Sequence, residues 1–259
     1  MAGKADQARN GSISGHYERL GSHYDELWEH STRFRDWMCD RILELAPCPP
    51  GAVIADVGGG TGIYADALLN RIPGASVFVV DPASNMLAQV PKRSGLYPVQ
   101  ATAALAPQAL AGLNIDQVDL LLIKEAVHHF TNLADDLAAL AALVSPGRYL
   151  LIVMLPKTIS YPLFREALSR FTELQPDPAD VARLLTASGL TVHRVQQAYH
   201  LTIPTHQWVS MIKNRFMSLL STFTDAELTA GAAEIEQQYG DREVVAFNDS
   251  FEFLVGQQS

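Results

Sequence analysis

From residue 52 onwards, short apolar runs alternate with longer amphipathic stretches. The apolar runs are rich in valine, isoleucine and leucine, and they occupy residues 52–57, 76–81, 97–101, 118–123 and 148–155. Between them, stretches such as 63–72 and 133–144 space their apolar residues as one face of a helix does. Continuous apolar strands separated by helices are typical of a parallel sheet covered on both faces. The pattern therefore predicts an α/β fold.

Beyond residue 155 the pattern changes to helical windows and alternating runs. Residues 160–171, 178–190 and 206–220 have helical periodicity, whereas 190–203 and 243–255 alternate apolar and polar positions as strands do. We expect the last of these runs to close the sheet as an antiparallel strand.

Several local signals in the chain are specific enough to be checked. Thr224 followed by Glu227 has the spacing of a capping box, which predicts the start of a helix. The pairs Pro73-Gly74 and Pro146-Gly147 predict helix stops before the next strands. If 206–220 is one helix, a single stripe carries Trp208, Met211, Ile212, Arg215 and Leu219.

The composition indicates a globular protein that does not act on nucleic acid. Hydrophobic residues make up 48% of the chain and charged residues 18%, proportions that fit a buried core rather than a disordered chain. The formal net charge is −9, and no cluster of Lys and Arg is present. Binding to phosphate backbones depends on such clusters. The same balance argues against an anionic membrane surface as a partner.

Cysteine usage and the first residues favour a reduced, cytoplasmic protein. Cys39 and Cys48 are too few for a disulfide framework or a tetrahedral zinc site. No apolar run approaches the roughly 18 residues that span a bilayer, and residues 1–14 lack the apolar stretch of a secretory signal. We expect residues 1–14 to be a disordered lead-in. No linker rich in Pro, Gly or Ser follows, so 15–259 is predicted to be one domain.

The stretch DVGGGTG, residues 56–62, is the most informative segment of the chain. It follows an apolar strand, contains four glycines within five residues, and precedes a predicted helix. Glycines let a backbone turn sharply and approach a ligand closely, because no Cβ stands in the way. Asp81 ends the next strand, where an acidic side chain can accept hydrogen bonds from the hydroxyls of a ribose. A nucleoside-containing cofactor is therefore expected at this edge of the sheet.

Two cofactor classes use this geometry, and the glycine spacing separates them. A dinucleotide fingerprint that began at Gly58 would need glycine at position 63, which is Ile63. The observed pattern, D-x-G-x-G-x-G led by Asp56, resembles the first motif of the class I S-adenosylmethionine-dependent methyltransferases. The resemblance implies a Rossmann-like, seven-stranded, mostly parallel sheet with an antiparallel last strand and helices on both faces. It also implies an N-terminal helical lid over 15–50, a cofactor-binding core over 51–155, and inserted C-terminal helices on the substrate side over 156–259.

The same resemblance implies which residues contact S-adenosylmethionine. The expected contacts are, on the methionine side, Asp56, Gly58, Gly60 and Gly62; on the ribose, Asp81; and on the adenine ring, Met86 and Thr102. Pro82 and Lys124 are further expected contacts of the cofactor. Relatives often carry an acid after the third strand for the adenine amino group. Here that region reads PVQATAALA, so Gln100 or Thr102 is expected to substitute.

Ionisable residues gather directly after the fourth strand, in the sequence KEAVHHF. Glu125 and His129 resemble the E-x-x-x-H pattern of small-molecule amine and carbon methyltransferases, in which another Glu often stands where this chain has His128. A neutral imidazole can remove a proton from the methyl acceptor. We therefore interpret His129 as the base, Glu125 as its partner or as an amine anchor, and His128 as a further catalytic candidate.

Two other interpretations of these side chains stay open. Neighbouring histidines on a helix point about 100° apart and rarely bind one ion, so a metal site is not expected. The side chains could also be ordinary rim residues beside a backbone that cradles the cofactor.

Aromatic residues outside the core are candidates for closing the site. Residues 16–28 resemble the tyrosine-containing opening segment of the family, in which Tyr24 would cover the cofactor. The expected substrate contacts are Tyr17, Trp28, Tyr161, Trp208, Met211 and Arg215, with Arg215 able to bind a carboxylate or carbonyl. Plain packing of these aromatic residues is the alternative.

The sequence thus predicts a methyltransferase of specialised metabolism that acts on a small, mostly apolar metabolite. Nitrogen or carbon acceptors are favoured over oxygen because of the resemblance around Glu125 and His129. One alternative is an enzyme of the same fold that binds the cofactor without transferring methyl, as a cyclase would. Another is a non-catalytic binding partner, and a nicotinamide-dependent oxidoreductase is the remotest. The sequence leaves the oligomeric state open.

Overall fold

The computed structural model describes residues 31–259, which fall into two compact units. The first, called the sheet unit here, comprises residues 31–156, 176–197 and 251–259. The second unit comprises residues 157–175 and 198–250. The strands β6 (Thr191–Pro204) and β7 (Val244–Gln257) contribute residues to both.

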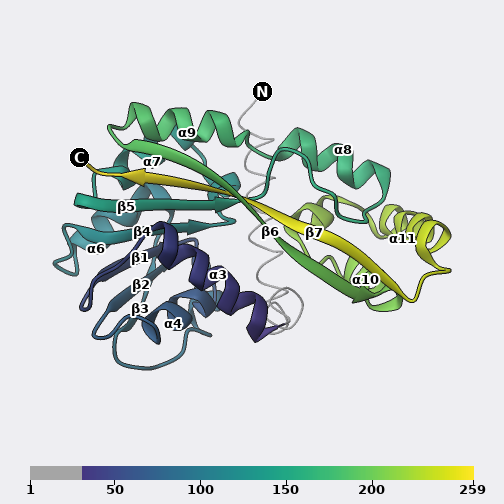
Figure 1. Cartoon of the computed structure of the whole chain (residues 1–259), viewed down its shortest axis with the longest axis horizontal. Coiled ribbons are helices and arrows are strands. Elements are labelled where there is room, and N and C mark those ends of the chain that lie inside the picture. Colours follow the sequence, from purple (N-terminus) through teal and green to yellow (C-terminus); the bar gives the residue numbers. More distant parts are fainter. Residues whose placement is uncertain (1–30) are drawn as a thin grey trace. The chain divides into compact units, whose positions relative to one another are not determined.

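The strands form one seven-stranded sheet in the order β3-β2-β1-β4-β5-β7-β6 (Figure 1). The other five strands are β1 (Val53–Val57), β2 (Ser76–Asp81), β3 (Leu96–Gln100), β4 (Val118–Lys124) and β5 (Val144–Met154). Pairing is parallel from β3 through β5, and β7 runs antiparallel to β5. The α/β class, the strand directions and the antiparallel closing strand predicted from the apolar pattern are confirmed.

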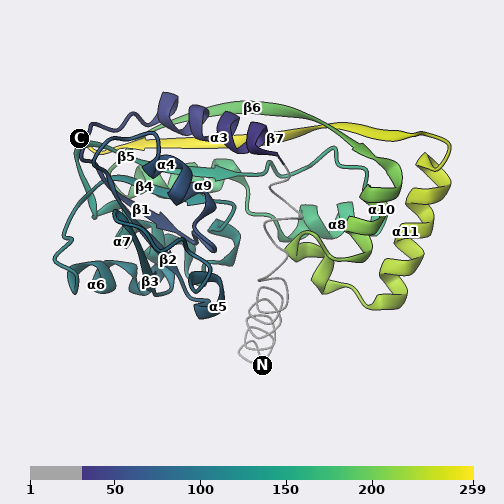
Figure 2. The same cartoon turned by 90° about the horizontal axis from the view of Figure 1, so that it is seen from below.

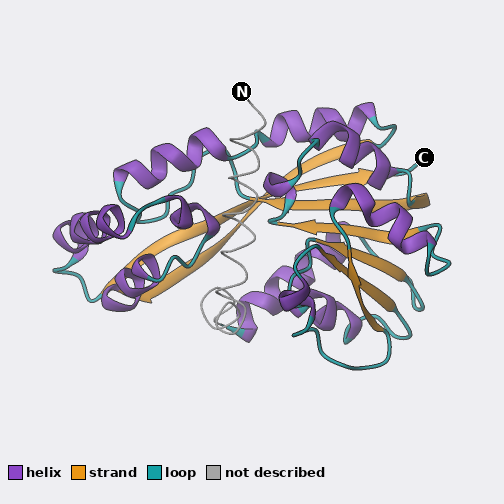
Figure 3. Cartoon of the chain, turned by 180° about the vertical axis from the view of Figure 1, so that it is seen from behind, coloured by secondary structure: helices purple, strands orange, loops and turns teal. Residues whose placement is uncertain are grey.

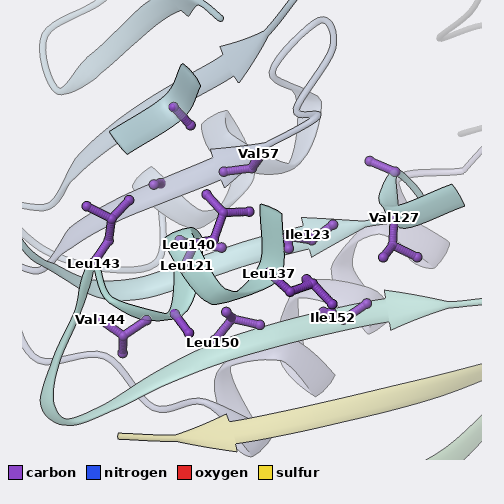
Figure 4. Close-up of a cluster of buried hydrophobic side chains, with 14 of the residues drawn as sticks. Val57, Leu121, Ile123, Val127, Leu137, Leu140, Leu143, Val144, Leu150 and Ile152 are labelled. Atoms are coloured by element: carbon purple, nitrogen blue, oxygen red, sulfur yellow. The ribbon is translucent and has the colours of Figure 1, made fainter. Parts of the chain in front are cut away.

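One face of the sheet is covered by a cluster of buried, mainly aliphatic side chains (Figure 4). Alternate residues of each strand, such as Val57 of β1 and Leu121 of β4, point into it. They meet Leu137 and Leu140 of α7 (Leu133–Ala141). The helices α6 (Ala106–Ala111) and α9 (Pro178–Ala187) border the same cluster, and α7 packs against both (Figure 2). This period-2 alternation is what a strand buried on both faces requires.

Other helices cover the opposite face of the sheet unit (Figure 3). The helix α3 (Thr32–Leu45) packs against α4 (Ile63–Leu69), and α5 (Ser84–Leu87) lies beside β2 and β3. Ser31 begins α3 by accepting a hydrogen bond from the Phe34 amide at 3.1 Å, as an N-cap does. Because β2 and β4 both pair in parallel with β1, the carboxyl ends of the three strands lie at one edge of the sheet.

The second unit contains α8 (Arg165–Leu174), α10 (Thr205–Lys213) and α11 (Asp225–Tyr239). Thr224 and Glu227 form the capping box at the start of α11, which confirms that prediction. Trp208 is 1% exposed and donates its indole N–H to the Pro162 carbonyl at 2.7 Å, so it anchors the interior of this unit.

The structure corrects the prediction of one helix across 206–220. The helix α10 ends at Lys213, and Arg215 has a φ of +55°. The Phe216 amide donates to the Met211 carbonyl and the Arg215 amide donates to the Ile212 carbonyl. These two bonds are a Schellman motif, which stops a helix with a left-handed residue. Arg215 and Leu219 therefore leave the predicted stripe.

The pair Pro146-Gly147 was predicted to separate a helix from the next strand. It lies inside that strand instead, because β5 already begins at Val144. The register shifts there: Val118 pairs with Val144, and Leu120 pairs with Tyr149. The extra residues form an irregularity that accommodates a proline without a backbone donor.

None of the helices within residues 31–259 is long and apolar enough to cross a membrane.

Candidate active site

The loop after β1 packs directly against the segment that follows β4. Gly58 has a φ of +77°, and its amide donates to the Val80 carbonyl at 2.7 Å. A Cβ on Gly58 would lie 2.3 Å from the Cβ of Ala126, which is inside van der Waals contact. Only glycine fits at this position. The contact brings the glycine loop next to the residues that follow β4, namely Glu125 and Ala126.

Asp81, at the end of β2, is fixed by the glycine loop. Its Oδ2 accepts a hydrogen bond from the Gly60 amide at 3.0 Å, and its Oδ1 accepts one from the Ala83 amide at 2.8 Å. Burial raises the pKa of Asp81, and the two amide donors act in the opposite direction. A carboxylate oxygen can accept more than one hydrogen bond, so Asp81 retains capacity for ligand hydroxyls.

Asp56, on β1, is a buried acid beneath the loop. It is 3% exposed, and a Cβ on Gly59 would lie 2.8 Å from its Oδ2. Burial raises the pKa of Asp56 to about 7, and the charge of Asp81 adds to this rise, whereas Lys124 lowers the pKa. The acid therefore titrates near neutral pH, where a nearby cationic ligand would favour its ionised form.

Lys124 and Glu125 form an ion pair at the end of β4. Both side chains are largely buried, with 7% and 18% of their surface exposed. The Lys124 Nζ also lies 4.5 Å from the centroid of the Tyr64 ring, within the range of a cation–π contact. Glu125 has a φ of +51°, a backbone conformation that residues other than glycine rarely adopt.

His128 and His129 follow in the short helix η2 (Val127–His129), with ring centroids 4.0 Å apart. Burial lowers the pKa of His128, and the charge of Glu125 acts in the opposite direction. The imidazole of His128 is therefore neutral at physiological pH and able to accept a proton. Strained backbone, an ion pair and a neutral imidazole thus meet within five residues beside the glycine loop.

Residues 28–212 match a family model that is described as a methyltransferase domain. The chain belongs to this family. The class I S-adenosylmethionine-dependent methyltransferase family predicted from the glycine loop is thereby confirmed, and so is S-adenosylmethionine as its cofactor.

Three individual proteins show how far the likeness extends. Over 162 residues the chain is 28% identical to the ubiquinone/menaquinone biosynthesis C-methyltransferase UbiE of Paracoccus denitrificans. That match covers 58% of this chain and 61% of the relative, so the chain spans about three fifths of the relative's length.

A solved structure of a putative methyltransferase from an antibiotic biosynthesis pathway of Anabaena variabilis has a TM-score of 0.65. It is 17% identical and covers 85% of this chain and 96% of its own. Phosphoethanolamine N-methyltransferase 2 of Haemonchus contortus, in complex with S-adenosyl-L-methionine, has a TM-score of 0.51 at 14% identity. That comparison covers 84% of this chain and 51% of the other. At these identities the two structures support the fold alone.

The predicted adenine contacts of this methyltransferase lie around β2 and β3. Met86 is 3% exposed, and its Cε lies 3.3 Å from the point where a Cβ on Gly60 would stand. Gln100 donates to the Pro82 carbonyl at 3.2 Å, and Thr102 is exposed at the start of η1 (Ala103–Leu105). Gln100 and Thr102 thus flank this region, and their contact with adenine remains a prediction.

The predicted substrate contacts lie elsewhere or outside the described residues. In the second unit, the Tyr161 hydroxyl donates to Asp249 Oδ1 at 2.5 Å, and both residues are buried. Arg215 donates to the Phe223 carbonyl and pairs with Asp225 at 2.7 Å. Met211, like Trp208, is buried there. Tyr17, Tyr24 and Trp28 lie in residues 1–30, outside the described part. The roles of all these residues in substrate or cofactor binding stay predictions.

Two site residues were missed by sequence reasoning, Tyr64 and Ala126. Tyr64 is the second residue of α4, and Ala126 is a small residue beside an acid. Neither type indicates a site by itself, because each acts through a contact distant in sequence, with Lys124 and Gly58 respectively. Among residues 31–259, no group of three or more His, Cys, Asp or Glu side chains is placed to hold a metal ion.

The left-handed backbone of Glu125 leads to a prediction about this methyltransferase's stability. We expect Glu125→Gly to be more stable than Glu125→Ala by about 1 kcal/mol, because both variants lose the carboxylate and only alanine keeps the strain. The free energy of unfolding in urea measures the difference. The same two variants at Asn114, which has a φ of +61°, are the control. They show the difference between glycine and alanine at another left-handed position of the chain. An alanine variant as stable as the glycine variant would show that Glu125 is not strained.

Proposed function

We propose that the protein transfers a methyl group from S-adenosylmethionine to a carbon or nitrogen atom of a small, mostly apolar metabolite. The observation that carries the proposal is the contact between Gly58 and Ala126. It joins a loop suited to the cofactor with a segment that carries Glu125 and His128.

The residues around the glycine loop fit the chemistry of the cofactor. The bound cofactor supplies an activated methyl group on a sulfonium cation. Asp56 and Asp81 place carboxylates beneath and beside the loop, where a cation and two ribose hydroxyls need partners. Because Gly60 carries no side chain, a ligand can approach the loop between Asp81 and Met86. We assign Asp56, Gly58, Gly60 and Gly62 to the methionine side and Asp81 with Pro82 to the ribose.

We assign the role of base to one of two neighbouring histidines, His129, which the sequence favours, or His128. Burial lowers the pKa of His128, and the charge of Glu125 acts in the opposite direction. Burial keeps His128 neutral, so its imidazole is ready to accept a proton from an acceptor as the carbon–methyl or nitrogen–methyl bond forms. Glu125 is then a positioning residue, because its carboxylate is paired with Lys124.

A carbon acceptor is supported by the relative that is named a C-methyltransferase, and a nitrogen acceptor stays part of the proposal. Both acceptor types require the same steps of this chain: to align the nucleophile with the methyl group and to accept a proton where one is present. The acceptor therefore has to be identified by product analysis.

A two-part experiment tests this function. Calorimetry with S-adenosylmethionine and S-adenosylhomocysteine should show binding of each with one site per chain. Incubation of the enzyme with methyl-labelled cofactor and a panel of small phenolic, enolic and amine acceptors should give a product heavier by one methyl group. We expect one of the two variants His129→Asn and His128→Asn to lower kcat by at least about 100-fold, as loss of a general base does. Each variant is the matched control for the other, because the same ring is lost one residue away.

The outcomes separate the remaining alternatives. A chain that binds the cofactor and yields a product of unchanged mass would be a cyclase-like enzyme. Binding without any turnover would point to a non-catalytic partner. A chain that is stabilised by a nicotinamide dinucleotide and not by S-adenosylmethionine would refute the proposal. Equal loss of kcat in the two histidine variants would refute only the assignment of the base.

A further inference from the structure

We propose that two copies of this chain form a dimer through the outer surface made by β3, η1 and α6. The accessible residues of 94–115 make up this surface, which is called the neutral surface here. The helix α6 lies on the outside of the sheet unit (Figure 2). The inference goes beyond the proposed function and does not depend on it.

Large apolar side chains are exposed on the neutral surface. In the part of the chain that the structure describes, the three most exposed large apolar side chains are Leu105 (54%), Leu113 (49%) and Tyr97 (42%). Tyr97 stacks on Phe78 with ring centroids 5.1 Å apart, and Phe78 belongs to the same buried cluster as Leu110 of α6. Tyr97 and α6 therefore lie on one face of the sheet, where α6 packs against β3. Single exposed apolar residues are normal, but three in one short stretch indicate an interaction surface.

The neutral surface carries no charged side chain. Residues 94–115 contain no Asp, Glu, Lys, Arg or His, although the whole chain has a formal net charge of −9. The outer face of an ordinary surface helix is charged or polar, whereas the core of an interface between proteins is depleted of charged residues. Two chains of like net charge repel each other, so they meet most readily where neither presents a charge. A partner that is recognised by its charge would find no counter-charge on this surface.

The exposed leucines at the two ends of α6 make the surface complementary to itself. Leu105 directly precedes the helix, and Leu113 follows its last residue, Ala111, by two positions. The exposed positions between the leucines are Gln108, Ala111 and Gly112, which leave room for a close approach. When two copies of α6 pack antiparallel about a two-fold axis near Gln108, Leu105 of each copy meets Leu113 of the other. Both pairs of leucines then leave water, which favours the dimer.

The edge of β3 favours a contact between side chains over an extended sheet. β3 is an edge strand with β2 as its neighbour. Pro98 stands at the centre of β3 and has no amide hydrogen to donate to a further strand. Proline is one of the residues that protect edge strands from pairing with another chain. The two copies are therefore held together by α6 and its flanking leucines.

The size of the neutral surface predicts a dimer of moderate affinity. Twelve of its residues are exposed and four are half-buried, whereas a standard interface has about 20–30 residues on each side. We expect a dissociation constant of about 1–100 µM for the wild-type dimer. Sedimentation equilibrium over concentrations that bracket this range should show the mass rising from 28.3 kDa towards twice that value. Added salt should leave the dimer unchanged or strengthen it, because salt screens the repulsion between two negative chains.

Charged variants test the neutral surface directly. Leu105→Glu and Leu113→Glu each place a carboxylate in an apolar contact, so each should raise the dissociation constant at least about 30-fold. Leu174→Glu is the matched control, because Leu174 is a leucine of α8 in the second unit that is 38% exposed. This control should leave the dissociation constant within about twofold of the wild-type value. All three positions are exposed, and circular dichroism checks that each variant is folded.

A cysteine at the proposed axis tests the antiparallel arrangement. A residue beside a two-fold axis meets its own copy, so Gln108→Cys in a Cys48→Ser background should form a disulfide between two chains under mild oxidation. The other native cysteine, Cys39, is fully buried. Leu174→Cys in the same background is the control, and it should run as a single chain on a non-reducing gel.

Several results would overturn the proposal. A wild-type chain that stays monomeric throughout the range would do so without the need for any variant, and so would a dimer that dissociates in salt, because ion pairs would then hold it. A dimer that survives both Leu105→Glu and Leu113→Glu would be formed by another surface. Equal weakening by Leu174→Glu would indicate unspecific apolar association. Monomeric charged variants without a cross-link at Gln108→Cys would refute the antiparallel arrangement alone.

Discussion

Replacing Gly58 with alanine is expected to abolish cofactor binding and to lower the free energy of unfolding by roughly 2–5 kcal/mol. Two effects add up at this position. The φ of +77° disfavours any residue with a Cβ, which accounts for about 1–2 kcal/mol. In addition, the new Cβ would stand 2.3 Å from Ala126 Cβ, so the loops after β1 and β4 must move apart. Chemical denaturation and calorimetry with S-adenosylmethionine measure the two consequences.

Two control variants divide the effect into its parts. Gly51 has a φ of +78°, and a Cβ there would meet nothing within 4 Å. Gly51→Ala should therefore show the cost of the left-handed backbone alone, about 1–2 kcal/mol, with normal cofactor binding. The double variant Gly58→Ala with Ala126→Gly removes the steric conflict and should recover part of the stability. If Gly58→Ala were no worse than Gly51→Ala, the close approach of the two loops would be wrong.

The core of the sheet unit could be predicted because its signals are local in the sequence. Each strand is a short apolar run that alternates between two buried faces, and the glycine loop follows directly from the spacing of Gly58, Gly60 and Gly62. Strand ends were placed within a few residues, as the bounds of β1 and β2 show. The placement of Asp81 beside the loop also follows, because parallel neighbours end at the same edge of a sheet.

The remaining features depend on contacts that the sequence pattern does not encode. The end of α10 is set by the left-handed conformation of Arg215, which is a residue type that carries no stop signal. The ion pair of Lys124 with Glu125 could have been considered from their adjacency, but the ring of Tyr64, sixty residues earlier, could not. The buried pair of Tyr161 and Asp249 likewise joins two distant segments of the second unit.

The electrostatics of Asp56 make stability and cofactor affinity depend on pH in opposite ways. The pKa of the buried acid, about 7, lies above its ordinary value of 3.8. Below pH 3.8 the group is protonated in both the folded and the unfolded state. Between these two values only the folded state holds the proton, so the free energy of unfolding falls by about 1.4 kcal/mol per pH unit as pH rises. Above about pH 7 the loss is complete and amounts to about 4 kcal/mol.

We therefore expect Asp56→Asn to be more stable than the wild type at about pH 8, by about 2–4 kcal/mol. The two proteins should converge near about pH 4, where both states of the wild type hold the proton. Urea denaturation across this range measures the difference, in which the titrations of all other groups cancel. A wild-type protein that is the more stable of the two at pH 8 would show that Asp56 is not a strained buried acid.

Cofactor binding should respond in the opposite direction. A sulfonium and an ammonium near Asp56 favour its ionised form, so affinity for S-adenosylmethionine should rise up to tenfold per pH unit towards pH 7 and level off above it. Binding below pH 7 should release a proton, which calorimetry detects as a dependence of the binding enthalpy on the buffer. In Asp56→Asn the affinity should be weaker at about pH 8 and flat with pH. S-Adenosylhomocysteine lacks the sulfonium charge, so its affinity should change less. Equal pH dependence for the two ligands would mean that Asp56 responds to the ammonium alone, and no dependence for either would place the methionine end away from Asp56.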